Sequence, residues 1–437
     1  MSRIVLTTMG SLGDLHPYLA IALELKRRGH QAVIATHGLY GERVESLLLE
    51  FAPVRPHFEE WGDRPDVLRE AMDERRGSKV VLRKLVLPYL RQSRDDLLEA
   101  ARGADLIVDH VLTLTAPFVA EKLGLPRVST TLQPLAMFSA HDPPVSPAAP
   151  WLTPLRALGP APWRLLWKAA AVVSRPWFRE LDSIRAEMGL PPERSHPMFA
   201  RRSRLLHLVL FSRELAAPQP DWPESAVQPG FPIHDRGGEG QGMPLALEVF
   251  LRQGEPPLVF TLGSSAVFAA GGFYVAAAAA ARKLGKRAVL LVGERALNEV
   301  PGIPPVAHAP AGERIVTIPY APHSELMPRA LANVHQGGVG TTAQAMHAGR
   351  PMLVVPFSHD QPDNADRLRR IGVARVLRRS QVSAAALARE LQALLADESL
   401  ARRAAEVAAR MKLEPGAAGA ADAIERLLAS SAASASA

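Results

Sequence analysis

Residue types that bind ligands or move protons gather at three turns of the sequence. The turns are GSLGD (10–14), which ends in an aspartate, HQGGVGTT (335–342), and SHDQPDN (358–364), which sets Asp360 beside Gln361. Each turn follows an apolar run typical of a buried strand, and the first two run directly into a helical pattern. Ligands of α/β proteins bind at the carboxyl ends of parallel strands. We therefore expect all three turns to lie at such an edge.

HQGGVGTT has the composition of a phosphate-binding turn. A helix that begins there presents free backbone N–H groups and the positive end of its dipole. The glycines let an anion approach those N–H groups, and Thr341 and Thr342 add hydroxyl donors in the first helical turn. A tight turn without a ligand has the same composition, so the neighbouring residues must decide between the two interpretations.

The neighbouring turns favour a sugar nucleotide as the ligand. Asp360 and Gln361 place hydrogen-bond acceptors and donors at adjacent positions, which suits the hydroxyls of a sugar. Tyr320 ends another predicted strand, where its ring would stack on a base. Base, diphosphate and sugar would then follow one another along one edge of the sheet. For Asp360 alone, the alternative is an N-cap of the following helix.

The elements that must position these turns form two similar halves. Strand-like runs alternate with helical patterns in residues 1–213 and again in residues 246–418, which predicts an α/β fold with two doubly wound parallel sheets. Residues 214–245 are dense in Pro and Gly and lack periodicity, as expected of a linker. Residues 419–437 should form a last helix and, from Ser431, a disordered low-complexity tail. A length of 437 residues agrees with two domains.

Several of these segments resemble a known family. HQGGVGTT, AGRPMLVVP and HDQPDN together resemble the nucleotide-sugar signature of family 1 glycosyltransferases, which include UDP-glucuronosyl-, sterol glucosyl- and antibiotic glycosyltransferases. GSLGDLHP (10–17) is similar to the GSxGDxxP turn of the bacterial and sterol members. SAHDPP (139–144), DWP (221–223) with GFP (230–232), and FTLGS (260–264) resemble more closely the rhamnosyltransferase B chains of rhamnolipid biosynthesis.

The resemblance implies the GT-B fold, in which two Rossmann-like domains face each other across a cleft. It implies that the C-terminal domain binds a UDP- or dTDP-sugar, that the N-terminal domain binds the acceptor, and that transfer inverts the sugar without a metal or a resident cofactor. The sequence holds no Asp-x-Asp motif for a divalent ion. The donor-binding residues that the resemblance indicates are Gly10, Ser11, Gly13, Gly263, Ser264, Tyr320, Ala321, His335, Gln336, Gly338, Gly340, Thr341, Thr342, Asp360 and Gln361.

One position departs from the family pattern. The histidine that contacts the diphosphate in the family aligns with Gln336. A glutamine donates an N–H to a phosphate oxygen but carries no charge. Either this carboxamide or the neighbouring His335 is therefore expected to make the contact.

A general base must take the proton of the attacking hydroxyl, and Asp14 is the first candidate. Family members carry a His at this turn in plant enzymes and an Asp in many bacterial ones, and Asp14 matches the latter. His16 competes for the role, and Asp109, at the end of a predicted strand, would orient the base together with His110. The alternative for Asp14 is a cap on the helix expected from Leu15.

Positive charge and tryptophan concentrate between Trp151 and Arg213. This window holds 11 Arg or Lys against 4 Asp or Glu, which equals the net charge of +7 of the whole chain, and four of the six tryptophans. The combination suits an anionic amphiphile or a membrane surface. The alternative is a solvated helix with buried tryptophans. The acceptor-binding candidates are Arg175, on a helix predicted over 163–188, with Trp167, Trp177 and His141.

These features predict a hexosyltransferase that acts on a hydroxyl of an apolar or amphiphilic acceptor. The subfamily resemblance implies a hydroxy-fatty acid lipid as acceptor and rhamnose as sugar. A natural-product or sterol glucosyltransferase is the alternative, and a non-catalytic protein that binds sugar nucleotides is a more distant one.

Other classes and compartments fit less well. A nicotinamide dehydrogenase is disfavoured because GSLGD is not GxGxxG and the second strand ends in Thr36-His37 without an acidic residue. No recognised nucleic-acid-binding motif accompanies the positive charge. The absence of cysteine fits a reducing compartment. We therefore expect a cytoplasmic enzyme that makes peripheral contact with the inner face of a membrane.

Overall fold

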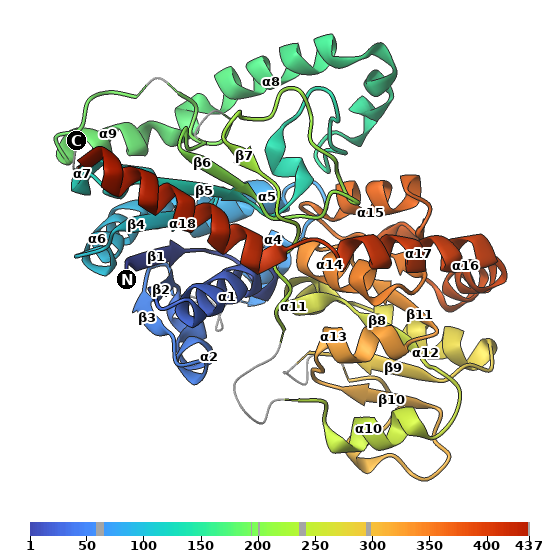
Figure 1. Cartoon of the computed structure of the whole chain (residues 1–437). Helices are drawn as coiled ribbons and strands as arrows, with labels where there is room; N and C mark the ends of the chain where they lie inside the picture. The colour runs from blue at the N-terminus through green and yellow to red at the C-terminus, as the bar shows by residue number, and fades with distance from the viewer. Residues whose placement is uncertain (58–64, 194, 200–201, 236–241, 294–298, 436–437) are drawn as a thin grey trace.

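The computed structural model describes residues 1–57, 65–193, 195–199, 202–235, 242–293 and 299–435. These residues form two parallel sheets, each covered by helices on both faces (Figure 1). In the described part of the chain, the N-terminal sheet has the order β3-β2-β1-β4-β5-β6-β7 and the C-terminal sheet the order β10-β9-β8-β11-β12-β13. The strand order reverses between β1 and β4 and between β8 and β11, so both sheets are doubly wound and the predicted α/β fold is confirmed.

The strands coincide closely with the apolar runs of the sequence. Those of the N-terminal sheet are β1 (Arg3–Thr7), β2 (Gln31–Thr36), β3 (Glu50–Pro53), β4 (Leu106–Asp109), β5 (Arg127–Thr131), β6 (Leu206–Val209) and β7 (Ala226–Val227). Those of the C-terminal sheet are β8 (Leu258–Thr261), β9 (Ala288–Leu291), β10 (Ile315–Ile318), β11 (Ala332–His335), β12 (Met352–Val354) and β13 (Ala374–Val376). The central strands are buried on both faces, which explains why they read as continuous apolar runs.

The helices follow the strands. The N-terminal domain contains α1 (Leu12–Arg27), α2 (Gly41–Ser46), α4 (Pro65–Ala71), α5 (Gly77–Val80), α6 (Leu90–Ala100), α7 (Ala116–Leu123), α8 (Pro160–Ser174) and α9 (Arg179–Glu187). The C-terminal domain contains α10 (Leu245–Arg252), α11 (Gly263–Ala266), α12 (Phe273–Lys283), α13 (His323–Leu326), α14 (Val339–Ala348), α15 (Gln361–Arg370), α16 (Ala384–Ala396) and α17 (Glu398–Met411).

A last helix, α18 (Gly416–Ala435), returns to the N-terminal domain, where Figure 1 shows it in red. Ala420 and Ile424 are buried in the same apolar cluster as Ile4 of β1. Arg28, at the end of α1, pairs with Asp422 and Glu425 of α18 at 2.6 Å each. The prediction of a disordered tail from Ser431 is wrong as far as Ala435, because an alanine-rich segment that packs at its start continues as a helix.

The predicted linker is also shorter than expected. Residues 226–227 add β7 to the edge of the N-terminal sheet, Gln228 is buried, and Phe231 packs in the apolar cluster around β1. This Pro-rich segment packs against the N-terminal domain. It forms no long helix or strand of its own, so its sequence shows no periodicity. Residues 236–241 of the predicted linker lie outside the described residues.

The helix predicted over 163–188 is interrupted. α8 ends at Ser174, a single turn spans Arg175–Phe178, and α9 starts at Arg179. Pro176 lacks a backbone N–H and its ring disfavours a continuous helix, which accounts for the break.

Two contacts between the domains involve buried side chains at their interface. In one, Arg367 of α15 pairs with Asp142 and, at 2.9 Å, with Asp363, while Arg156 pairs with Asp366 at 2.7 Å. In the other, Met72 of the N-terminal domain is buried in the apolar core of the C-terminal domain. These contacts hold the carboxyl edges of the two sheets towards each other.

Candidate active site

The beginnings of three helices, α1, α11 and α14, meet at the domain interface. Each follows a central strand, namely β1, β8 or β11. The closest approach joins Gly13 of α1 to Gly340 of α14, where a Cβ added to Gly340 would lie 3.0 Å from the Cα of Gly13. A side chain at Gly340 would push the domains apart, whereas a Cβ on Gly13 would lie 3.7 Å from the Gly340 backbone N, in ordinary contact. Gly340 therefore allows two positive helix ends, one from each domain, to lie close together.

Asp14 lies in the first turn of α1 and divides its two carboxylate oxygens between two tasks. Its Oδ2 accepts hydrogen bonds from the backbone N of Ser11 at 2.8 Å and from the Ser11 hydroxyl at 3.2 Å, which caps the helix. Gly10 must lack a side chain, because its Cβ would lie 2.3 Å from the same oxygen and its φ is +138°. Burial raises the pKa of Asp14 to about 6, and the two bonds from Ser11 oppose this rise. The capping alternative is thus realised together with a carboxylate suited to accept a proton near neutral pH.

The other oxygen of Asp14 faces His110. The distance from Asp14 Oδ1 to His110 Nε2 is 3.8 Å, longer than a hydrogen bond, and the His110 side chain is 1% exposed. His110 Nδ1 accepts a bond from the backbone N of Leu112 at 3.4 Å, which leaves the proton on Nε2. Burial lowers the pKa of His110 to about 3, so the ring is neutral. His110 therefore points a neutral N–H donor at the free oxygen of Asp14.

Two predicted catalytic residues lie elsewhere. His16 turns away from Asp14 towards Arg43, whose Nη1 is 3.3 Å from His16 Nε2, and its ring contacts His234. Burial, followed by Arg43, keeps the pKa of His16 well below its usual value, so it is a poor base. Asp109 does not orient the base either, because its Oδ2 accepts a bond from Arg127 at 3.0 Å. Strand residues alternate in direction, so Asp109 and His110 point to opposite sides of the sheet edge.

Gln336, and not His335, lies at the start of α14. Gln336 Nε2 is 3.3 Å from the Thr341 hydroxyl, and a Cβ on Gly263 would lie 2.3 Å from that amide. His335 is fully buried and its Nδ1 accepts a bond from the backbone N of Gly337. Burial lowers the pKa of His335 to about 3. The structure therefore brings Gln336 to the expected phosphate position, together with Gly338, Thr341 and the turn of Gly263 and Ser264. Thr342 is fully buried behind them.

Asp360 and Gln361 lie directly beside this helix start, as expected. Asp360 Oδ2 accepts bonds from the backbone N of Val339 at 3.0 Å and from Asn364 Nδ2 at 2.7 Å. It occupies the N-cap position of α15 but makes no capping bond there. Burial, followed by the charge of Asp14 across the interface, raises the pKa of Asp360 to about 7. The two carboxylates thus sense each other across the cleft.

Gln361 and Asn364 complete the edge of the site. Gln361 Oε1 accepts bonds from the backbone N of Phe357 and of Ser358, so only its amide N–H groups remain to donate to a ligand. Asn364 was not predicted as a site residue, although it ends the segment HDQPDN. It bonds the Gly337 carbonyl at 2.8 Å as well as Asp360, and so joins the second and third turns of the sequence.

Tyr320 lies at the edge of the C-terminal sheet, and the stacking of its ring on a base stays a prediction. Its hydroxyl donates to the Asp235 carbonyl at 2.6 Å, and it follows β10, the edge strand of the C-terminal sheet. Ala321 beside it is buried. Tyr320 therefore fastens the segment that connects the domains to the C-terminal sheet. From the sequence, only the position of Tyr320 at the end of a strand is visible, and not its distance from the centre of the sheet.

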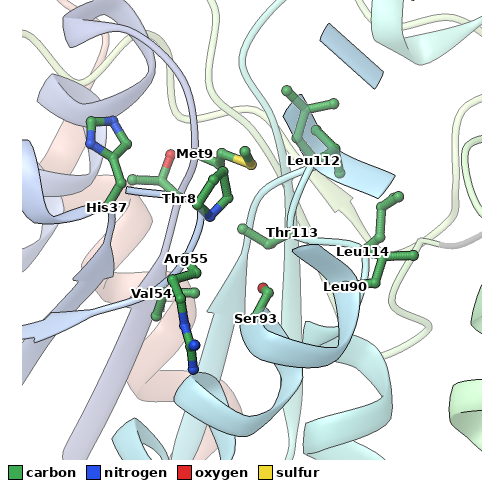
Figure 2. A pocket seen from close by; sticks show the side chains of 12 residues that line it. Thr8, Met9, His37, Val54, Arg55, Leu90, Ser93, Leu112, Thr113 and Leu114 are labelled. Carbon is green, nitrogen blue, oxygen red and sulfur yellow. The ribbon is translucent and has the colours of Figure 1, made fainter. Parts of the chain in front are cut away.

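Two pockets of the N-terminal domain share Thr113 and Leu114 in their lining. The first lies between the turns after β1, β3 and β4, and its lining is mixed, with Met9, Val54, Leu90 and Leu114 beside Thr8, His37, Arg55 and Ser93 (Figure 2). The second, on the other side of Thr113 and Leu114, is more polar, and its lining residues include His110, Thr130, His207 and Arg202. Thr8, which lines the first pocket, donates through its hydroxyl to the backbone carbonyl of Asp14 at 3.0 Å, and His110 lines the second pocket.

The predicted acceptor residues line neither pocket. Arg175 pairs with Asp182 at 2.7 Å, and the cations of Lys79 and Arg83 lie 5.6 and 5.8 Å from the centre of the Trp177 ring. Trp167 packs edge-on against Phe138, behind the wall of the second pocket. The exposed His141 contacts Arg164 at 3.0 Å.

The sequence segments SAHDPP and DWP prove to be structural. Asp221 accepts bonds at 2.7 Å from the Ser139 hydroxyl and from the backbone N of Ala140, and Asp142 pairs with Arg367 of the other domain. These segments therefore hold a loop against the C-terminal domain. In the described residues, no group of three or more His, Asp or Glu side chains is arranged as a metal site.

Comparisons with known proteins agree with this architecture. The model of the erythromycin biosynthesis protein CIII-like C-terminal domain matches residues 289–427, and that of the glycosyltransferase family 28 N-terminal domain matches residues 4–136. The chain is 32% identical over 431 residues to O-mycaminosyltylonolide 6-deoxyallosyltransferase of Streptomyces fradiae, with 95% of this chain and 94% of that enzyme covered.

Two further relatives widen the comparison. The chain is 28% identical over 397 residues to sterol 3-beta-glucosyltransferase of Neurospora crassa, and the match covers 86% of this chain but 24% of that protein. The crystal structure of the glycosyltransferase VinC in complex with dTDP has a TM-score of 0.67 at 19% identity, covering 98% of this chain and 99% of that one.

The matches span both domains and extend along nearly the whole chain. In the matched region, the start of α1 bonds the carboxylate of Asp14, the start of α14 bonds that of Asp360, and the two helix starts approach each other at Gly13 and Gly340. The chain is therefore an enzyme that belongs to the family 1 glycosyltransferases of the GT-B fold.

Proposed function

We propose that this glycosyltransferase moves a hexose, with inversion and without a metal, from a nucleoside diphosphate sugar to a hydroxyl of an apolar or amphiphilic acceptor. The observation that supports this most directly is the pairing of Asp14 with His110 opposite the start of α14. One carboxylate oxygen is held by the helix cap, and the other faces His110, which lines the second pocket. A base is thus placed between an acceptor site and a donor site.

In the proposed reaction, Asp14 Oδ1 accepts the proton of the acceptor hydroxyl while that oxygen attacks C1 of the sugar. The bond between C1 and the diphosphate oxygen breaks, and the diphosphate leaves with the electron pair. Attack from the face opposite the leaving group inverts the configuration at C1. The backbone N–H groups at the start of α14, together with the amide of Gln336, stabilise the charge that develops on the diphosphate. The Nε2–H of His110 faces the ionised Asp14 from 3.8 Å, beyond hydrogen-bond distance, and its dipole stabilises the negative charge.

The sugar itself would be held by Asp360 and Gln361. Asp360 accepts hydrogen bonds from sugar hydroxyls and the free amide of Gln361 donates to them. We propose a dTDP-linked 6-deoxyhexose, rhamnose in the first place, as the donor. The names of two relatives support this, one being a 6-deoxyallosyltransferase and the other a dTDP complex. A UDP-sugar is the second candidate, because the Neurospora crassa relative is named a glucosyltransferase.

For the acceptor we propose a hydroxylated amphiphile with an acidic group, such as a hydroxy-fatty acid. The first pocket offers an apolar wall to an alkyl chain. The second contains Arg202, whose guanidinium donates to the backbone carbonyls of Ala136, Met137 and Phe199. Burial lowers the pKa of Arg202 to about 10, and the charge of Asp221 opposes this fall. Arg202 therefore replaces Arg175 as the cation proposed to meet the acid.

A flat polycyclic acceptor is the alternative, and the macrolide- and sterol-modifying relatives favour it. The deciding experiment follows released nucleoside diphosphate from dTDP-rhamnose and UDP-glucose, each with a 3-hydroxy-fatty acid, a macrolide aglycone, a sterol or no acceptor. Transfer to the hydroxy acid, absent from Asp14→Asn, is the expected result. Release that does not depend on any acceptor, or binding without release, would remove the proposed function.

A further inference from the structure

Helix α8 carries an exposed apolar face on the outer side of the N-terminal domain, at the upper edge of Figure 1. Leu165, Val172 and Val173 are 70%, 75% and 72% exposed, and Trp151 and Leu158 just before the helix are 65% and 68% exposed. These five are a large share of the 14 large apolar side chains that are exposed among the described residues. We call Leu165, Lys168, Ala169, Val172 and Val173 the α8 face.

The inner side of α8 is also apolar. A rotation of the helix about its axis would therefore expose other apolar residues in place of the α8 face. Trp163 is buried, and Trp167 packs against Phe138 and Phe199. A helix that is apolar on both sides buries both, either in protein or in a membrane interface. The α8 face meets no protein element among the described residues, so its occupant must come from outside.

The charges around the α8 face specify the occupant. From Trp151 to Arg179 the sequence contains five basic residues and no acidic one. Two of these cations are paired, Arg156 with Asp366 and Arg175 with Asp182. The other three, Arg164, Lys168 and Arg179, have no carboxylate partner among the described residues. Exposed Leu, Val and Trp side chains among unpaired cations match the interface of an anionic bilayer.

A second copy of the chain fits this surface less well. A two-fold dimer would place the α8 face of one protomer against that of its partner. The same unpaired cations would then face one another without an acidic residue between Trp151 and Arg179 to neutralise them. Lipid headgroups supply the negative charge that a second copy lacks.

We propose that the α8 face rests the N-terminal domain on an anionic lipid surface. The segments beneath α8 lead directly to the second pocket: Phe138 and Phe199 contact Trp167, and their neighbours Ala136 and Met198 line that pocket. An amphiphile that leaves the bilayer at α8 thus has one layer of side chains to pass. Among the described residues, no single helix is long and apolar enough to cross a membrane.

Sedimentation with vesicles tests the proposal on the full chain. The protein should bind vesicles of phosphatidylcholine with phosphatidylglycerol, and bind pure phosphatidylcholine at least tenfold more weakly. The double variant Leu165→Ser with Val172→Ser should bind the anionic vesicles about tenfold more weakly than the parent does. The single variant Lys168→Glu should also bind them more weakly than the parent, and this difference should be larger in low salt than in high salt. The matched control is Leu245→Ser with Leu413→Ser, two side chains that are 79% and 84% exposed in the C-terminal domain, and it should bind as the parent does.

Two measurements separate the possible outcomes. Equal vesicle binding by the α8 variant and by the control overturns the proposal. A dimer seen by light scattering that the α8 variant dissociates, with no vesicle binding by the parent, assigns the face to a second copy and also overturns it. Nucleotide release with a soluble acceptor should be unchanged in the α8 variant, so loss of the proposed transferase function would be visible independently.

Discussion

At the scale of single residues, the site depends on how burial and capping share one carboxylate. Asp14 gives Oδ2 to the start of α1 and keeps Oδ1 for chemistry, and burial raises its pKa while Ser11 opposes the rise. His110 is neutral because burial lowers its pKa, so it can donate but cannot act as the base. The division of labour between these two side chains leads to the first three predictions.

Asp14→Asn should lower kcat by about 10²–10⁴. The asparagine Oδ1 still accepts the hydrogen bond from Ser11, so the helix cap and the melting temperature should be nearly unchanged. The dissociation constant of the nucleoside diphosphate should also stay the same. Steady-state kinetics, calorimetric binding and thermal unfolding measure the three quantities. Turnover close to that of the parent would move the base to another residue.

The pH profile should report the same carboxylate. Asp14 works in its ionised form, and its pKa of about 6 means that kcat/KM falls tenfold per pH unit below pH 6 and is level above it. His110→Phe keeps the burial but removes the Nε2–H that faces ionised Asp14. The pKa of Asp14 should then rise, so the acid limb should move to higher pH. An unchanged limb in His110→Phe would leave His110 without a role in holding Asp14.

Arg202 should distinguish acidic from neutral acceptors. In Arg202→Met, the KM for a hydroxy acid should rise about tenfold or more, because the charge-assisted bond is lost. The KM for its methyl ester should stay the same. The comparison is made within one variant, so a general loss of folded protein affects both acceptors equally. An equal rise in KM for the acid and for the ester would mean that Arg202 does not bind the acid. Its role would then be structural, through the carbonyls of residues 136, 137 and 199.

At the scale of elements, the strands were predictable and their surroundings were not. Continuous apolar runs identified the central strands, and glycine followed by threonine identified the start of α14, because both signals are local. The break at Pro176, the packing of residues 226–231 and the helix beyond Ser431 depend on neighbours distant in sequence. The same holds within the site: proximity of Asp109 and His110 to the base was foreseen, but which one faces Asp14 depends on the alternation of side chains along β4.

Gly340→Ala tests the close approach of α1 and α14. Alanine favours a helix by about 1 kcal/mol over glycine, so the melting temperature should not fall. The new Cβ would lie 3.0 Å from the Gly13 Cα, so the domains must separate by a few tenths of an ångström. A loss of more than tenfold in kcat/KM is expected, since misplacing reacting groups is costly. Gly272→Ala, where the Cβ meets nothing within 4 Å, is the control and should retain activity.

At the scale of the whole molecule, buried charges fix how the domains sit. Arg367 and Asp363 are 2% and 0% exposed, and Arg367 also pairs with Asp142 of the other domain. Arg367→Met should therefore destabilise the protein by about 3–5 kcal/mol, because it removes the cation that pairs with the fully buried Asp363. Arg369→Met removes a pair whose arginine is 60% exposed and should cost less than about 1 kcal/mol. The free energy of unfolding of both variants is measured in denaturant. Equal losses in the two variants would show that the buried pair of Arg367 contributes no more to stability than an exposed pair.

The return of α18 to the first domain has a consequence for the order in which the protein is made. The apolar cluster around Ile4 and Leu15 is completed by Ala420, Ala421 and Ile424 of α18. Arg28 can pair with Asp422 and Glu425 only after α18 has been made. The ribosome delivers the C-terminal domain complete before α18 emerges. The N-terminal domain, although synthesised first, must therefore keep one flank of α1 uncovered throughout translation. The first half to be made is the last to be finished.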